Sequence, residues 1–164
     1  MPFALAKWGP LNCWRPMSES HSTDDFSEGR FKPHGNIDVR VEGNICIFRA
    51  EGPFNMEAIV ALGKARRAIV ENWDNRGRAA TIAVFHNSIL MTSDALKAYS
   101  DGLKAHLTQV KPNVAVAWVV APDVEGRALL LPYFAEIFAN CNVPWQAFEE
   151  LDAARAWVKA RLDA

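Results

Sequence analysis

Five polar residues whose side chains could act in catalysis or binding lie close together in mid-chain: His86, Ser88, Thr92, Ser93 and Asp94. Imidazole, hydroxyl and carboxylate are the groups of a nucleophilic triad. Two of these candidates, His86 and Ser88, lie within one short loop, and no oxyanion motif follows them. Because a triad needs geometry as well as residue types, this spacing does not favour one. We therefore predict no catalytic residue and no enzymatic activity.

The hydroxyl-rich segment Thr92-Ser93-Asp94 precedes an amphipathic stretch that predicts a helix to about residue 107. Thr92 or Ser93 can cap this helix, and Asp94 complements the helix dipole. The same place also suits phosphorylation, because a helix start tolerates the roughly two negative charges that a phosphate adds. The two interpretations are compatible. We predict an interaction or phosphorylation surface at Thr92, Ser93 and Asp94.

Asn55, Glu57, His86 and Asn87 are the candidates for ligand binding. Asn55 and Glu57 lie where a helix is expected to begin after a buried strand, and His86 and Asn87 follow the next buried strand. Ligands of open α/β sheets usually bind at the carboxyl ends of the strands. Helix capping explains Asn55 and Glu57 equally well, so both interpretations stay open.

Sequence signatures of cofactors and metals are absent. The chain has no GxGxxG, no GxxxxGK[ST], no HExxH and no GxSxG. Cys13, Cys46 and Cys141 are far apart and form no CxxC or Cys/His cluster, a pattern typical of reduced thiols. We predict no cofactor and no metal site.

The balance of charge and hydropathy limits the choice of partners. The net charge is -1, from 18 basic and 19 acidic residues, so no overall field attracts nucleic acid or an anionic membrane. No apolar run reaches the roughly 18 residues that a membrane-spanning helix needs, and the first residues do not form a secretory signal. These features predict a cytoplasmic protein that binds no nucleic acid.

The order of elements predicts one α/β domain. Residues 1–34 contain four prolines and a polar, mostly acidic run at 18–28, which indicates a flexible tail before a domain at 35–164. Strands are expected at 37–41, 45–50, 79–85, 114–120 and 145–148, and helices at about 55–75, 92–107, 122–140 and 151–162. The order β-β-α-β-α-β-α-β-α, with uniformly apolar later strands, predicts a mostly parallel sheet with an antiparallel first strand.

Two of the expected helices have unusual faces. Lys64, Arg66 and Arg67 make the first helix basic on the side opposite its apolar stripe, but acidic residues interleave, so a solvent-exposed face is the preferred interpretation. The third helix carries more apolar residues, from Tyr133 to Phe138, than one covered face needs. It can be ordinary core, line an apolar pocket or form the face of a homodimer.

Several of these features resemble the SpoIIAA-like superfamily, which includes the STAS domains of anti-sigma-factor antagonists and sulfate transporters and related STAS/Sec14-type domains. The resemblance covers roughly residues 35–162, and it rests on the element order, the serine-bearing turn, the stretch 52–57 and the ending 148–158. The phosphoacceptor turn of the antagonists reads Asp-Ser-Ser-Gly-Leu. Here Ser93 matches the phosphorylated serine and Leu96 the last residue, whereas Thr92, Asp94 and Ala95 differ from that motif.

The resemblance implies a non-enzymatic regulatory or protein-interaction module that uses the Ser93 turn as its contact surface. Its Sec14-type members imply an alternative, a carrier or sensor of a small lipophilic or anionic ligand. A protein partner or a homodimer fits the first hypothesis. A bound ligand would support the second.

Overall fold

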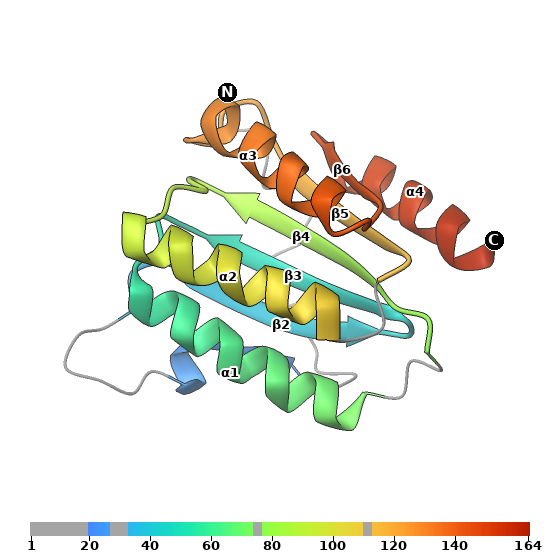
Figure 1. Ribbon diagram of the computed structural model, residues 1–164, viewed down its shortest axis with the longest axis horizontal. Helices are drawn as coiled ribbons and strands as arrows, with labels where there is room; N and C mark the ends of the chain where they lie inside the picture. The colour runs from blue at the N-terminus through green and yellow to red at the C-terminus, as the bar shows by residue number, and fades with distance from the viewer. Residues whose placement is uncertain (1–19, 27–32, 74–76, 110–112) are drawn as a thin grey trace.

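A six-stranded sheet carries the fold, and its strands lie side by side in the order in which they occur in the chain, from β1 to β6 (Figure 1). The computed structural model describes residues 20–26, 33–73, 77–109 and 113–164. The strands are β1 (Ser20–Ser22), β2 (Asn36–Glu42), β3 (Ile45–Glu51), β4 (Ala80–His86), β5 (Ala115–Val120) and β6 (Trp145–Phe148). The helices are η2 (Thr23–Phe26), α1 (Met56–Asn72), α2 (Ser93–Gln109), α3 (Arg127–Asn140) and α4 (Leu151–Asp163).

The sheet is mixed. β1 and β3 pair with β2 in antiparallel fashion, and β3, β4, β5 and β6 are parallel to one another. From residue 35 onward the elements follow the order β-β-α-β-α-β-α-β-α. The predicted α/β fold, with its antiparallel first strand and mostly parallel sheet, is thereby confirmed.

The segment Ser20–Phe26 differs from expectation, because it forms β1 and η2 instead of part of a tail. Thr23 is fully buried, and its hydroxyl accepts a hydrogen bond from the backbone N–H of Ile37 at 3.1 Å. This segment therefore belongs to the sheet and its edge. Residues 1–19 and 27–32 of the predicted tail lie outside the described residues.

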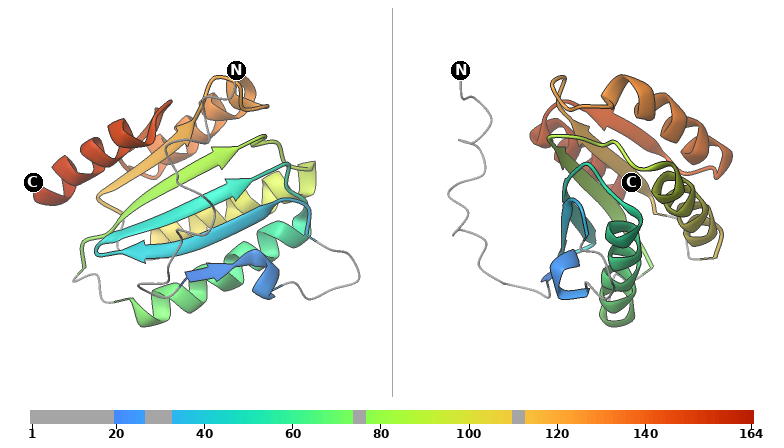
Figure 2. Two further views of the ribbon diagram at one scale, coloured as in Figure 1. Left: turned by 180° about the vertical axis from the view of Figure 1, so that it is seen from behind. Right: turned by 90° about the vertical axis from the view of Figure 1, so that its left-hand side faces the viewer.

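Helices cover both faces of the sheet. Figures 1 and 2 show α1, α2 and α3 on one face and α4 on the other. Right-handed β-α-β crossovers that advance in one direction along a sheet place their helices on the same face. α4 follows the last strand and packs its Ala154 and Val158 against the opposite face.

The alternation of side chains along β4 and β5 supplies both cores. Ile82 and Val84 of β4 face α4, and the intervening Ala83 and Phe85 face α1 to α3. β5 alternates in the same way, with Trp118 on the side of α1 to α3. Such two-sided burial explains why these strands read as continuous apolar runs.

α3 begins at Arg127, later than the expected start near residue 122, and Pro132 lies inside it. Gly126, at the N-cap, has a positive φ of 82°. None of the helices in the described ranges is both long and apolar enough to cross a membrane.

Candidate functional site

A groove of about 440 Å³ runs between α1 and α2. Each helix contributes a glycine to it, Gly63 from α1 and Gly102 from α2. A Cβ atom at either position would meet nothing within 4 Å, so both glycines face open space. This volume lies within the roughly 300–1,000 Å³ typical of small-molecule sites. The remaining lining residues are Ile59, Leu62, Arg66, Arg67, Glu71, Ala98, Tyr99, Leu103, Ala105 and His106.

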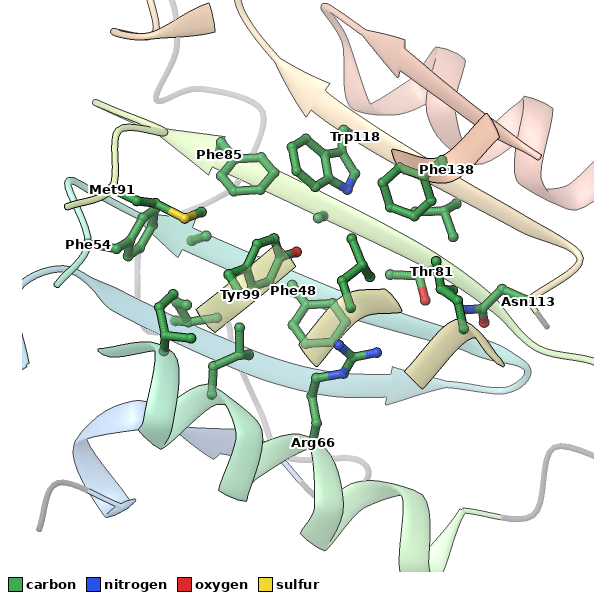
Figure 3. Close-up of a pocket in the computed structure, with 18 residues that line it drawn as sticks. Phe48, Phe54, Arg66, Thr81, Phe85, Met91, Tyr99, Asn113, Trp118 and Phe138 are labelled. Carbon is green, nitrogen blue, oxygen red and sulfur yellow. The ribbon is translucent and has the colours of Figure 1, made fainter. Parts of the chain in front are cut away.

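An inner cavity of about 50 Å³ lies between the same two helices and the sheet (Figure 3). It shares Ile59, Leu62, Arg66, Tyr99 and Leu103 with the groove, so the two spaces adjoin. Its other walls are mostly aromatic and aliphatic. They are formed by Ile37, Phe48, Ala50, Phe54, Thr81, Ala83, Phe85, Met91, Leu107, Asn113, Val116, Trp118 and Phe138.

Arg66 brings a charge to this apolar site. It lies four residues after Leu62, which places both side chains on the inward side of α1. The side chain is half-buried, and its guanidinium lies over the ring of Phe48, 5.8 Å from the ring centroid. A cation in this position is attracted by the negative face of the ring. The prediction that the basic residues of this helix are solvent-exposed is therefore wrong for Arg66. It is confirmed for Arg67 and Lys64, which are both exposed.

Two titratable groups of α2 lie near Arg66 and respond to it. Burial, aided by the charge of Arg66, lowers the pKa of His106 from 6.5 to about 4, so its imidazole is neutral at neutral pH. Burial raises the pKa of Tyr99, opposed by Arg66, so its hydroxyl keeps its proton. The three groups together therefore present one positive charge, a neutral imidazole and a phenol to the site.

The predicted ligand residues lie apart from this groove, at the carboxyl ends of the strands. Asn55 caps α1, because its Oδ1 accepts hydrogen bonds from the N–H groups of Ala58 at 3.1 Å and His34 at 2.9 Å. Glu57 lies in the first turn of α1. Asn87 donates from Nδ2 to Glu51 Oε1 at 2.6 Å.

His86 ends β4 and is half-buried. Burial lowers its pKa, and the nearby charge of Arg49 acts in the same direction against that of Glu51. The structure thus brings His86 and Asn87 to the same edge of the sheet as Glu51, the last residue of β3.

The loops that follow β3, β4 and β5 are joined to one another. Phe54 donates its N–H to the carbonyl of Leu90 at 2.9 Å, and Ile89 donates to the carbonyl of Glu125 at 2.9 Å. These bonds belong to two parallel bridges, Phe54 to Met91 and Ser88 to Glu125. These hydrogen bonds therefore fix the loops that lead into α1, α2 and α3 relative to one another.

The Thr92-Ser93-Asp94 segment lies at the start of α2. The carbonyl of Thr92 accepts from the N–H of Leu96 at 2.8 Å, and Asp94 Oδ1 accepts from the N–H of Ala95 at 2.9 Å. Hydrogen bonds from the Thr92 hydroxyl and from this N–H hold the pKa of Asp94 below its usual value. All three side chains are exposed, and Met91 immediately before them lines the inner cavity.

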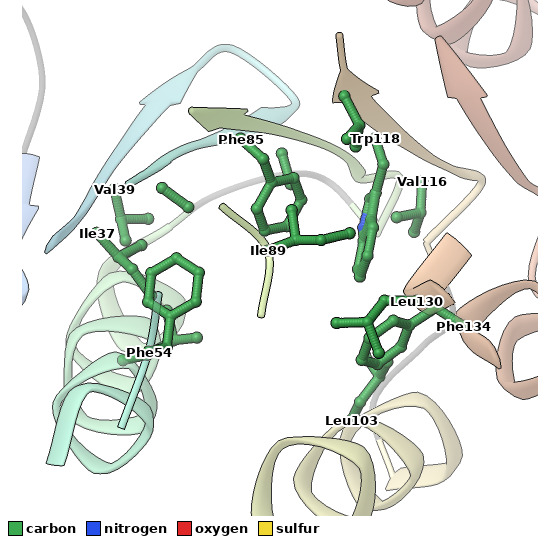
Figure 4. Packing of buried hydrophobic residues seen from close by; sticks show 14 of the residues in the cluster. Ile37, Val39, Phe54, Phe85, Ile89, Leu103, Val116, Trp118, Leu130 and Phe134 are labelled. Carbon is green, nitrogen blue, oxygen red and sulfur yellow. The ribbon is translucent and has the colours of Figure 1, made fainter. Parts of the chain in front are cut away.

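The apolar residues of α3 divide between the core and the surface. Phe134 is fully buried and packs against Trp118 at 4.8 Å between ring centroids (Figure 4). Phe138 reaches the wall of the inner cavity. Leu129 and Tyr133 remain 69% and 40% exposed. The helix thus contributes to the predicted pocket through Phe138, but the cavity itself is centred on α1 and α2.

Other kinds of site find no support here. Within the described ranges, no three His, Cys, Asp or Glu side chains are grouped so that they could hold a metal ion. Comparison with known proteins adds no assignment, because no family model, no curated protein and no solved structure matches the chain.

Proposed function

We propose that this protein is a non-enzymatic carrier or sensor of a small lipophilic ligand, which binds in the groove between α1 and α2 and reaches the inner cavity. The observation that carries the proposal is the adjacency of the two spaces, which share five lining residues. Concave, mostly apolar sites with few polar groups are the usual places where proteins bind small molecules.

The chemistry of the lining residues favours binding over catalysis. The polar members of the groove, Arg66, Arg67, Glu71, Tyr99 and His106, form no hydrogen-bonded pair of nucleophile and base in the part of the chain that the structure describes. Such a pair is the usual mark of nucleophilic catalysis. The resemblance to STAS/Sec14-type domains agrees with a binding role.

A titration with neutral probes tests the proposal. We expect alkan-1-ols from butanol to octanol to shift NMR signals of α1, α2 and Trp118, with binding tightening about fourfold for each added methylene until the space is filled. Ala83→Leu fills part of the inner cavity, because Ala83 is one of its lining residues, and should weaken binding. Ala156→Leu makes the same change on the exposed face of α4 and should leave binding unchanged.

Two results would count against the proposal. Shifts scattered over the surface would mean that the groove is not a ligand site. Equal alcohol affinities in the wild type and in Ala83→Leu would mean that the ligand does not reach the inner cavity, which Ala83 lines.

A protein-interaction module at the Ser93 turn is the second candidate. It is favoured by the exposure of Thr92, Ser93 and Asp94 on a backbone fixed by the hydrogen bond from Thr92 N–H to the Phe54 carbonyl, 3.1 Å long. The two functions are compatible, since Met91 connects the cavity wall directly to this surface. Mass spectrometry of the protein purified from its own host tests it. A phosphate that maps to Ser93 and is lost in Ser93→Ala supports the module, and an unmodified Ser93 leaves phosphorylation without support.

A further inference from the structure

We infer that the ligand of the α1–α2 site is a small organic anion, with an apolar body in the groove and cavity and a carboxylate that Arg66 and Tyr99 bind. This inference rests on the proposed function and specifies its ligand. Three of the lining side chains, those of Arg66, Tyr99 and Trp118, carry a hydrogen-bond donor that has no acceptor within the described part of the chain.

Arg66 is the first of these donors. Its guanidinium lies on the wall shared by the groove and the cavity, and it makes no ion pair or hydrogen bond with any residue in the described ranges. The contact that it does make is with the face of the Phe48 ring. A half-buried charge without a counterion is costly, and a guanidinium offers five donors and no acceptor. A planar carboxylate can satisfy two of those donors at once.

Tyr99 and Trp118 add neutral donors to the same space. The Tyr99 hydroxyl makes no hydrogen bond within the described part of the chain, and neither does the indole nitrogen of Trp118. Figure 3 shows the Tyr99 hydroxyl and the Arg66 guanidinium extending into the space between the helices and the sheet. Because an indole N–H can only donate, and Arg66 likewise, a ligand must bring acceptors to pair with them.

The charges at the rim of the groove do not cancel that of Arg66. Arg67 and Glu71 are both exposed and lie one helical turn apart, so they offset each other. Tyr99 keeps its proton because burial raises its pKa, and His106 is neutral at neutral pH because burial and Arg66 lower its pKa to about 4. The net charge that faces the groove is therefore the positive charge of Arg66.

Paired probes test the inference. Octanoate and octan-1-ol share an alkyl chain and differ in the head group, and octanoate is ionised at pH 7. We expect calorimetric titration to show octanoate binding about tenfold or more tightly than octan-1-ol, as a charge-assisted hydrogen bond allows. Arg66→Gln should abolish this preference while leaving octan-1-ol bound. Tyr99→Phe should reduce the preference several-fold.

Lys159→Gln is the matched control, because it removes one positive charge from the exposed face of α4 and should leave the preference intact. Equal binding of the two probes, or a preference that persists in Arg66→Gln, would overturn the anion inference and leave the lipophilic site standing. If neither probe binds to a wild-type protein that is folded by circular dichroism, the proposed function and this inference both fail.

Discussion

The hydroxyl groups of Ser100 and Tyr133 lie 3.0 Å apart and link α2 to α3. Ser100 Oγ donates to the carbonyl of Leu96 at 2.7 Å, so it accepts the hydrogen bond from Tyr133. Ser100 is almost fully buried. α2 is thus tied to α3 on one side, whereas the groove separates it from α1 on the other.

Removing this link should destabilise the fold without touching the groove. We expect Tyr133→Phe to lower the free energy of unfolding by about 0.5–1.5 kcal/mol, because it removes one hydrogen bond to a buried hydroxyl. Urea denaturation measures the change. Leu129→Ala alters the most exposed apolar side chain of the same helix and should change stability by less than about 0.5 kcal/mol. Equal effects of the two variants would contradict the role of the link.

Two glycines should respond in opposite ways to alanine. Gly126 has a φ of 82°, and a Cβ there would lie 2.5 Å from Leu90 Cδ2, so we expect Gly126→Ala to cost about 1–3 kcal/mol. Gly102 lies within α2, where a Cβ meets nothing within 4 Å, so Gly102→Ala should stabilise by about 0.5–1 kcal/mol. Thermal unfolding of both variants provides the measurement. A stabilised Gly126→Ala would show that the loop before α3 relaxes.

His106 should make the protein less stable in acid. Its pKa is lowered to about 4 in the folded protein and returns to about 6.5 on unfolding, so the unfolded chain binds the proton more readily. The neutral form of His106 therefore costs the folded state nothing above about pH 6.5. As the pH falls from 6.5 toward 4, protonation of His106 favours the unfolded chain and the free energy of unfolding decreases. We expect His106→Gln to reduce this acid loss by on the order of 1–2 kcal/mol, allowing for solvent screening.

The cause of the shift can be tested separately by NMR titration of the imidazole. Arg66→Gln should raise the pKa of His106, because the charge of Arg66 is the second contribution to its lowering. An unchanged His106 pKa in this variant would assign the whole shift to burial.

Asn55 should matter as a helix cap. Its side chain accepts hydrogen bonds from the N–H groups of His34 and Ala58, and Asn55→Ala removes both. We expect a loss of about 1–2 kcal/mol in urea denaturation. Asn55→Asp keeps an acceptor oxygen and should retain most of the stability. A loss of stability in Asn55→Asp equal to that in Asn55→Ala would argue against capping.

The sequence was a good guide to the sheet because burial leaves a clear pattern. β4 and β5 are covered on both faces, which favours apolar residues, so the largely apolar runs from Ala80 and from Ala115 predict buried strands. The segment Ser20–Phe26 was missed because its side chains are mostly polar. It is held by individual hydrogen bonds to other segments, such as that from Ile37 N–H to the Thr23 hydroxyl, which composition does not reveal.

The groove was missed for a different reason. Arg66 was assigned to a solvent-exposed face with its basic neighbours, although its spacing from Leu62 also fits the inward face. Sequence cannot show whether a long cationic side chain points to water or folds over an aromatic ring of another element, here Phe48 of β3. Gly63 and Gly102 are the sequence features that could have indicated the groove, because small residues that face each other on adjacent helices leave open space between them.

The sequential strand order has a consequence for biosynthesis. Every strand from β2 to β6 pairs with the strand made just before it, so no pairing within the sheet waits for a later segment. A nascent chain can therefore extend the sheet one β–α unit at a time as it leaves the ribosome. α4 is made after all the strands, and by packing on β4 and β5 it closes the second face last. We therefore expect the sheet to assemble in the direction in which the chain is translated.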